Sequence, residues 1–250
     1  MKNLIKGDIR RIMCKRSFWI AFIASVLVNF VIVLFYLFGM NYSSLNYLQG
    51  NIDGMGDLGG TVLGVAVFLA VYADDFKSMT IISVIGRGNS RLKVILAKFI
   101  NSVLVTLLLY AIFSVQVLIT TKVMGIELSP DESLALGLAI FRGIFLTIGY
   151  VTIAAIVIYA TGNMPFSVFM IVMFYIVVPT VLVVTSTLPI LKNIHLERYD
   201  YSGLTSAGIS DIILGMPASG IFTLLLAFII YVGGSLAIIY AVFNKKELDF

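Results

Sequence analysis

The side chains in this sequence that could take part in chemistry form no catalytic or metal-binding pattern. The chain has one histidine, His195, and one cysteine, Cys14, which excludes an internal disulfide and a cysteine-cluster metal site. No Gly-x-x-x-x-Gly-Lys-Ser/Thr phosphate loop occurs, and the His-Glu-x-x-His and Gly-x-Ser-Gly motifs of metallo- and intramembrane serine proteases are also absent. The sequence therefore predicts a protein that is not an enzyme and that binds no metal or cofactor itself. We expect His195 to be a surface histidine.

Arg142 is the only charge that lies well inside an apolar run. It is about 12 Å from the start of its predicted helix, at about 1.5 Å per residue. An ionised guanidinium at that depth is costly unless water or a polar group receives it. No acid lies four residues away on the same helix, so the partner must come from another span, from lipid headgroups or from a wet cavity. Arg142 is thus a candidate for a transport pathway or subunit interface, with snorkelling or internal pairing as the alternative.

The elements that position these residues are six long apolar runs. Of the chain, 60% is hydrophobic and 12% is charged, and the mean hydropathy is +1.06, whereas soluble proteins have about 25% charged residues. A spanning helix needs about 20 apolar residues. We predict an all-α polytopic membrane protein with six transmembrane helices, and we expect Gly, Asn and Pro at 161–165 to separate the fourth helix from the fifth. The predicted spans are 18–40, 58–73, 99–121, 134–160, 166–188 and 219–243.

Lysine and arginine divide unevenly between the two sides of these spans. Thirteen lie before the first span, between the second and third, and after the sixth, and only Lys122, Lys192 and Arg198 lie on the opposite side. The positive-inside rule therefore predicts that both termini are cytoplasmic, with outer loops at 41–57, 122–133 and 189–217. Residues 1–17 are expected to form a basic interfacial helix rather than a cleavable signal, because the following apolar stretch is too long. Residues 244–250 form a cytoplasmic tail.

The predicted inner loop at 74–98 is far longer than a connector between antiparallel helices needs. It begins with Asp74 and Asp75, continues through an apolar stretch at 79–85, and turns at 86–91 before Lys98. We expect a short helix in this loop, lying on the membrane surface or against another protein. The next helix should start at Asn89 or Ser90.

This order of residues resembles the ABC-2 type permeases, the membrane subunits of ABC transporters. The resemblance covers the whole chain and lies in the acidic pair at Asp74 and Asp75, then Ser90-Arg91, then Lys98. A basic start before Phe18-Trp19 and an aromatic residue, Phe243, followed by a basic, acidic and apolar tail are similar to the family as well. The most similar members are small bacterial permeases of antimicrobial-peptide, lantibiotic-immunity or bacitracin-type exporters, with a type V exporter-like fold.

The resemblance implies a mechanism with separate partners. Two permease subunits, identical or related, would form the pathway in a bacterial plasma membrane, and two copies of a separate ATPase would bind ATP and Mg. The substrate would be an amphipathic or peptide-like molecule, and no nucleic acid is expected as a partner. The loop at 74–98 would supply the coupling helix, beside an N-terminal elbow helix. The implied ATPase-coupling residues are Met79, Ile82, Ile85, Arg87, Ser90 and Arg91.

Three further features concern packing and the outer surface. Gly56, Gly60 and Gly64 recur every four residues, which allows close helix packing within the subunit or at a dimer seam. Pro179 is expected to kink the fifth span. The apolar second half of the outer loop, 205–216, is expected to re-enter the outer leaflet as a short helix capped by Thr205 or Ser206, and an ordinary surface loop is the alternative.

Two other functions remain open at this point. The chain could be a membrane immunity or sensor subunit that binds a toxin or peptide without moving it, or a carrier that needs no ATPase. A stoichiometric ATPase on purification would favour the permease over both.

Overall fold

The structure of the chain is a computed structural model. It describes residues 2–16, 18–20, 58–78, 80–186 and 196–245, together with 22, 23, 26, 27, 30, 31, 34 and 50. Within these residues the chain is helical and contains no strand. The first half contains α1 (Lys2–Met13), α4 (Leu58–Lys77), α5 (Thr80–Gly86), α6 (Arg91–Val123) and α7 (Pro130–Thr161). The second half contains α8 (Met164–Val172), the π-helical turn η1 (Met173–Val177), α9 (Val178–Ser186), the 3₁₀ turn η2 (Leu196–Arg198), α10 (Tyr201–Ile213), α11 (Pro217–Ala227), the π-helical turn η3 (Phe228–Gly233) and α12 (Gly234–Lys245).

Four of the described helices are long and apolar enough to cross a membrane: Arg91–Val123, Pro130–Thr161, Met164–Ser186 and Pro217–Lys245. They contain the predicted third, fourth and sixth spans and residues 166–186 of the predicted fifth span. The chain is therefore an all-α membrane protein, as the composition indicated. The predicted second span lies within α4, which continues through Asp75 to Lys77 and is not among the four. Most of the predicted first span lies outside the described residues.

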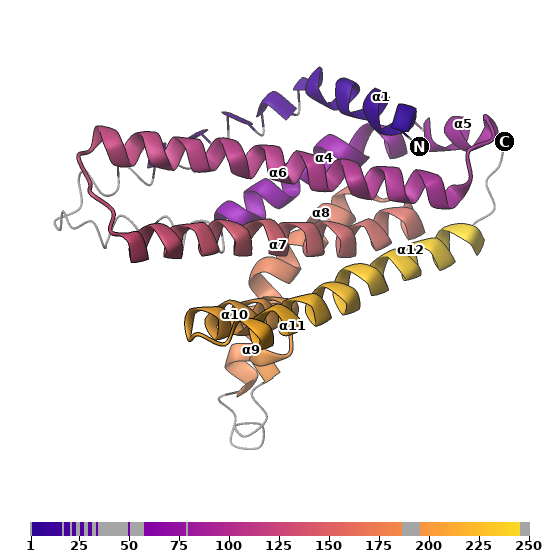
Figure 1. Cartoon of the computed structure of the whole chain (residues 1–250). Helices are drawn as coiled ribbons and strands as arrows, with labels where there is room; N and C mark the ends of the chain where they lie inside the picture. The colour runs from indigo at the N-terminus through magenta and orange to yellow at the C-terminus, as the bar shows by residue number, and fades with distance from the viewer. Residues whose placement is uncertain are drawn as a thin grey trace.

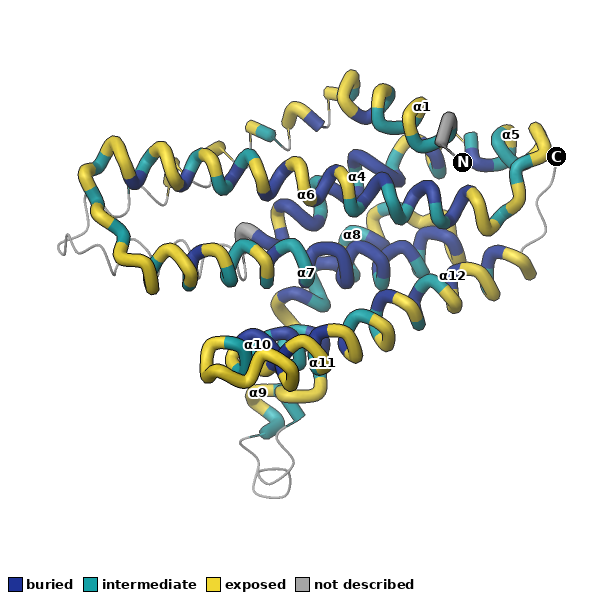
Figure 2. Tube along the Cα trace, viewed as in Figure 1, coloured by how far each residue is buried: buried dark blue, intermediate teal, exposed yellow. Residues whose placement is uncertain are grey.

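Helix α7 is the centre of the bundle. It packs against α4, α6, α8, α10, α12 and η3, and Figure 2 shows most of the buried chain where α4, α7 and α8 meet. The outward faces of α6, α9 and α11 carry exposed apolar side chains. Such faces suit lipid, because hydrocarbon supplies the apolar surroundings that water would not.

The helix ends follow local sequence signals. Helix α7 stops at Thr161 because Gly162 takes a left-handed conformation with φ of 71°, and Asn163 then caps α8 by accepting a hydrogen bond from Phe166 N at 3.1 Å. The predicted break at 161–165 is confirmed. Ser90 caps α6 by accepting from Lys93 N, so the predicted start of that helix at Asn89 or Ser90 is confirmed as well.

Pro179 follows a local widening of its helix. The π-helical turn η1 ends just before it, and Val178 N donates to the carbonyl of Met173, five residues back. Proline lacks an N–H and crowds the preceding turn, and a π-turn is one way for a helix to accommodate this. The irregularity expected at this proline is thus a π-turn in the backbone.

The outer segment differs from its prediction in one respect. A helix is present, but α10 begins at Tyr201 and is capped by Asp200, whose Oδ1 accepts from Gly203 N at 2.6 Å. Thr205 and Ser206 therefore do not cap it. The hydroxyl of Thr205 instead donates to Tyr201 O at 2.7 Å within the helix. Aspartate is among the preferred N-cap residues, and its negative charge also suits a helix N-terminus.

Helices α10 and α11 form a close hairpin. A Cβ atom on Gly220 would lie 2.4 Å from the carbonyl oxygen of Gly208, so these two backbones touch because neither residue has a side chain. Gly215, with φ of 80°, makes the turn between the helices. Figure 1 shows this hairpin beside α7, whereas α1, α5 and the end of α12 lie together at another end of the molecule. We call the latter the basic end.

Candidate functional site

Helix α5 lies on the surface at the basic end. Ile81 is buried, Ile82 and Ile85 are half-buried, and Ser83 and Arg87 are exposed. Gly88, with φ of 87°, and a hydrogen bond of 3.0 Å from Asn89 Nδ2 to Val84 O close the turn that leads to α6. The short helix expected in this loop is therefore present, with one face against the protein and one face that none of the described residues covers. Met79, another candidate for coupling, lies outside the described residues.

Arg91 joins the start of α6 to the end of α12. Its Nη1 atom donates to the carbonyl oxygens of Phe243 and of Asn244, the latter at 2.9 Å. Its guanidinium lies 5.5 Å from the centre of the Phe243 ring, which adds a cation–π contact. A cation at this position also complements the partial negative charge of a helix C-terminus. Contact of Arg91 with an ATPase stays a prediction. Within the chain, the residue holds the start of α6 against the end of α12.

A buried ion-pair network at the basic end connects four elements. Lys98 of α6 has a side chain only 5% exposed and pairs with Asp75 of α4 and, at 2.5 Å, with Asp8 of α1. Arg11 of α1 contacts both acids, Asp8 at 3.2 Å and Asp75 at 2.5 Å. The hydroxyl of Thr80, the first residue of α5, donates to Asp75 Oδ1 at 2.8 Å. The network therefore holds α1, α4, α5 and α6 together.

Burial and ion pairing shift the pKa of the Asp75 carboxyl group in opposite directions. Burial alone would raise the pKa of this carboxyl group, but the Lys98 ammonium and hydrogen bonds from Lys98, Thr80 and Arg11 outweigh burial and lower the pKa below its ordinary value. Asp75 is consequently ionised at neutral pH. Its neighbour Asp74, with a side chain 56% exposed, makes a separate pair with Lys15 at 3.0 Å.

Of this network, the sequence pointed to Asp75 and Lys98 but not to their contact with α1. Residues 1–17 were expected to form a basic interfacial helix; a helix is present at Lys2–Met13, with Ile12 buried and Leu4, Ile5 and Ile9 half-buried, and its position at the membrane surface stays a prediction. Asp8 lies on this helix and pairs with Lys98. One feature of the sequence could have predicted this ion pair. Asp75 lies near the end of α4 and Lys98 near the start of α6, so two antiparallel helices bring these opposite charges close together.

Arg142 of α7 contacts the outer helix α10. Its Nε donates to Ser206 Oγ at 3.2 Å and its Nη2 to Ser202 Oγ at 3.4 Å. The two serines lie one helical turn apart and face the same guanidinium. The sequence left open a partner from another span, from lipid headgroups or from a wet cavity. The partners in the structure instead come from α10, in the segment between the fifth and sixth predicted spans.

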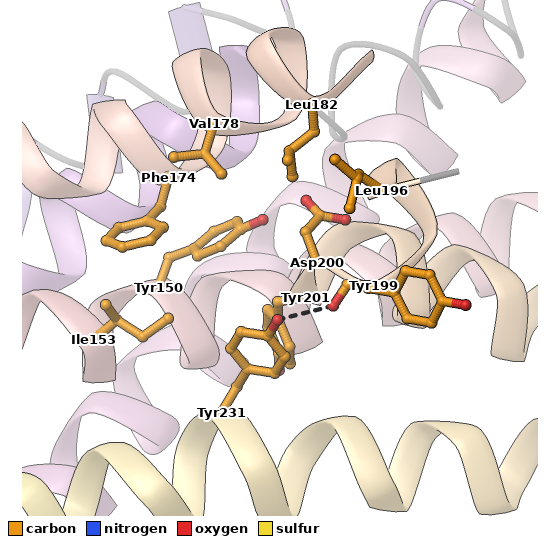
Figure 3. Close-up of a pocket in the computed structure, with 10 residues that line it drawn as sticks. All are labelled: Tyr150, Ile153, Phe174, Val178, Leu182, Leu196, Tyr199, Asp200, Tyr201 and Tyr231. Atoms are coloured by element: carbon orange, nitrogen blue, oxygen red, sulfur yellow. Dashed lines mark hydrogen bonds between the residues drawn. The ribbon is translucent and has the colours of Figure 1, made fainter. Parts of the chain in front are cut away.

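A second site is a pocket between α7, η1, α9, η2, α10 and η3, which we call the tyrosine pocket. Its volume is about 310 Å³, and Figure 3 shows the Tyr150 hydroxyl and the Asp200 carboxylate pointing toward one space, whereas the Tyr199 ring points away from it. Arg142 does not line it. The lining residues are Tyr150, Ile153, Phe174, Val178, Leu182, Leu196, Tyr199, Asp200, Tyr201 and Tyr231.

Tyr201 fixes the position of the pocket against α7. Its hydroxyl donates to Phe145 O at 2.8 Å, and its ring stacks on the Phe145 ring with 5.5 Å between centres. A Cβ atom on Gly149 would lie 2.1 Å from the Tyr201 ring, so the glycine provides the space that the ring fills. The Tyr231 hydroxyl donates to Tyr199 O at 2.9 Å and ties η3 to the same wall.

Asp200 is the one acidic residue in the pocket lining. Burial raises the pKa of its carboxyl group above the ordinary value, although hydrogen bonds from the backbone N–H groups of Gly203 and Ser202 and the charge of Arg142 oppose this. The residue lies in the loop before α10. Sequence reasoning missed Asp200 as a site residue, because its distance from the pocket aromatics is set by the fold and not by spacing along the chain.

The remaining predicted residues concern packing. Gly60 is buried in α4, and a Cβ atom on Gly64 would lie 3.3 Å from Ile171 and 3.4 Å from Tyr175. The packing role predicted for Gly64 is therefore confirmed within the subunit, against α8 and η1. Gly56 and His195 lie outside the described residues.

Comparisons with protein-family models and with curated proteins give no match. The assignment of function therefore rests on the residues and geometry described above.

Proposed function

We propose that this chain is the membrane-spanning permease subunit of an ATP-driven exporter of the ABC-2 kind. It would move an amphipathic or peptide-like substrate out of the membrane or the cell. ATP and Mg would be bound by a separate ATPase present in two copies, and a second permease subunit would complete the pathway. The proposed location is a bacterial plasma membrane, with six spans and the basic end in the cytoplasm.

The observation that carries the proposal is helix α5 with its ion-pair network. A seven-residue helix stands between α4 and α6, where a short turn would be enough to connect them. Its outer face presents Ser83 and Arg87, and its first residue, Thr80, is bonded to Asp75. Asp75 in turn pairs with α6 through Lys98 and with α1 through Arg11. This arrangement suits a docking helix whose displacement by a partner is passed to the membrane helices.

The proposed mechanism follows these contacts. Closure of the ATPase pair on ATP displaces α5, and the buried network makes α1, α4 and α6 follow it as one group. Because α4 and α6 both pack against α7, the movement reaches α10 and the tyrosine pocket, which α7 helps to form. The substrate would be bound at the pocket side and released as α7 shifts against α10.

Charge reversal on α5 tests this proposal. In membranes that contain the chain and its ATPase, Arg87→Glu should lower substrate-stimulated ATP hydrolysis and transport by about tenfold, the effect of losing about 1.4 kcal/mol at an interface charge pair. Lys122→Glu is the matched control, because Lys122 is also exposed but lies at the far end of α6. Wild-type transport by the Arg87 variant would overturn the coupling role of α5.

The tyrosine pocket also suits a subunit that binds a peptide without moving it. The two functions differ in their need for ATP. Accumulation of substrate on one side of a proteoliposome that depends on ATP hydrolysis supports export, whereas ATP-independent binding with no accumulation supports an immunity or sensor subunit.

A further inference from the structure

The tyrosine pocket has a chemistry that the proposed function does not specify. Its wall contains four tyrosine rings and Phe174, and Asp200 is the only charged residue among the described residues that line it. No lysine or arginine is among the described residues of this lining. The pocket therefore combines aromatic faces, apolar side chains and a single negative charge.

These features together favour one class of ligand. The face of an aromatic ring attracts a cation placed within about 6 Å of its centre. A carboxylate provides a full counter-charge, and the aliphatic residues Leu182, Leu196, Val178 and Ile153 receive an apolar chain. An anionic ligand would face Asp200 without a basic partner among the described lining residues, and a neutral ligand would add no charge to the backbone N–H groups and Arg142 that already act on the carboxylate.

We propose that the tyrosine pocket binds an organic ammonium group carried on an apolar chain. The ammonium lies between Tyr150 and Tyr231 and next to the Asp200 carboxylate, and the chain lies along α9 toward Leu182. The volume of about 310 Å³ is at the lower end of the range for pockets that hold small molecules, about 300–1,000 Å³. It suits a headgroup or a single side chain rather than a folded peptide.

The orientation of Asp200 is already fixed for this role. Gly203 N donates to Oδ1 at 2.6 Å, and Figure 3 shows the carboxylate beside Leu196 and on the same side of the pocket as the Tyr150 hydroxyl. Burial opposes ionisation of this group, so a bound cation stabilises the charged form. Capping α10 does not by itself require the charge, since asparagine caps helices as well as aspartate does.

This inference deepens the proposed function, and it rests on that function only in naming the exported substrate as a cationic amphiphile. Ammonium binding is measured on the isolated chain without any ATPase, so the ammonium site and the proposed function can fail separately. If Arg87→Glu loses transport but the chain binds no ammonium, only the ammonium site is overturned. If the chain binds ammonium but Arg87→Glu transports normally, only the coupling role of α5 is overturned.

The test compares choline with 3,3-dimethylbutanol, in which a carbon atom replaces the charged nitrogen. The chain is placed in nanodiscs of phosphatidylglycerol, and binding is followed by saturation-transfer NMR. Choline should bind at least tenfold more tightly than the neutral analogue, and Asp200→Asn should remove most of that difference while keeping the helix cap. Asp131→Asn, which removes an exposed charge outside the pocket, should leave the difference unchanged. Equal binding of the two probes, or an unaltered preference in Asp200→Asn, would overturn the proposal.

A second pair of variants tests the aromatic contribution where Asp200→Asn fails to fold. Tyr231 lines the pocket and is half-buried, so its ring can be replaced without opening the centre of the bundle. Tyr231→Leu should weaken choline binding several-fold, and Tyr231→Phe, which keeps the ring, should not. Equal binding by these two variants would contradict a cation–π contact at this residue.

A final experiment distinguishes two ligands that both carry an ammonium group, a lipid headgroup and a free cationic amphiphile. In nanodiscs of phosphatidylcholine, loss of the choline signal would identify a lipid headgroup as the occupant. A signal that persists would identify a cationic amphiphile from the aqueous or cellular pool.

Discussion

At the scale of single residues, the pKa values of two carboxyl groups, Asp75 and Asp200, are shifted in opposite directions. Asp75 is nearly fully buried, yet ion pairing with Lys98 and hydrogen bonds keep its pKa low. Asp200 is half-buried, and burial raises its pKa because its nearest partners are backbone N–H groups and a more distant Arg142. The first carboxylate is a structural anion with its cations present. The second is an anion whose counter-charge we assign to a ligand.

The raised pKa of Asp200 predicts how cation binding depends on pH. Only the ionised carboxylate attracts choline, so binding is lost as the pH falls through the raised pKa, at a higher pH than for an ordinary carboxyl group of pKa about 4. The other titratable groups that act on this region are Glu197 on η2, Arg142 and Tyr150 on α7, and Tyr231 on η3. Choline titrations by NMR at several pH values measure the effect. The Asp200→Asn variant should show a flat profile, and a pH response that survives this substitution would assign the titration to another group.

Arg142 allows a second prediction at this scale. Arg142→Gln removes a charge that lies beside the pocket but keeps a side chain able to bond Ser202 or Ser206. We expect transport or substrate preference to change about tenfold, while the melting temperature in detergent shifts by only a few degrees, since the lost hydrogen bonds are worth about 1–3 kcal/mol.

A double variant, Ser202→Ala with Ser206→Ala, is the control for Arg142 because it removes the same hydrogen bonds and keeps the charge. It should transport more like the original protein than Arg142→Gln does. Normal transport together with a large loss of stability in Arg142→Gln would instead mark Arg142 as a structural residue.

At the scale of helices, the contacts that hold neighbouring elements together are ion pairs at the basic end and aromatic packing near the hairpin of α10 and α11. The basic end is joined by Lys98, Asp75, Asp8 and Arg11, which connect α1, α4 and α6. The hairpin α10–α11 is joined to α7 by the ring of Tyr201 in the space over Gly149. A buried charge network fixes relative positions strictly, because separating its members leaves uncompensated charges. We therefore expect α1, α4, α5 and α6 to move as one group.

Removal of Lys98 tests this joint. Lys98→Met leaves Asp8 and Asp75 facing each other with only Arg11 between them, and loss of one partner from a buried pair costs about 3–5 kcal/mol. Thermal unfolding in detergent should show a lower melting temperature than for Lys93→Met, which removes an exposed charge on the same helix. Equal melting temperatures would contradict the role of the network.

The lowered pKa of Asp75 sets the pH range of that comparison. Because folding lowers this pKa, the carboxylate contributes its full stability above the ordinary carboxyl pKa of about 4, and the contribution is lost as the pH falls through the lower folded value. The difference between the Lys98 and Lys93 variants should therefore be measured near neutral pH.

At the scale of the whole molecule, apolar length and charge distribution determine most of the fold. Apolar runs are long enough to identify the helices at Arg91–Val123 and, despite Arg142, at Pro130–Thr161, and the Gly-Asn-Pro break separates α7 from α8. The predicted start of α10 was wrong, because the cap is the carboxylate of Asp200, five residues before Thr205. The tyrosine pocket could not be predicted, since its residues come from six elements and periodicity within one helix does not show which faces meet.

The predicted topology is tested by cysteine labelling in intact cells. After Cys14, which is exposed, is replaced by serine, Glu127→Cys should react with an impermeant maleimide from outside, because the turn between α6 and α7 is predicted to be extracellular. Ser83→Cys should react only after permeabilisation. The reverse pattern would invert the orientation and place α5 out of reach of any cytoplasmic ATPase.

The most direct measurement of the central claim is a photo-crosslink from α5. A benzophenone amino acid is placed at Ser83, which is exposed, in the chain expressed in its native membrane, and the crosslinked partner is identified by mass spectrometry. A matched probe at Lys122 samples the opposite end of α6. The permease proposal predicts one dominant partner from position 83 only, with a Gly-x-x-x-x-Gly-Lys-Ser/Thr phosphate loop in its sequence. A partner without that motif, or no partner that distinguishes position 83 from position 122, would contradict it.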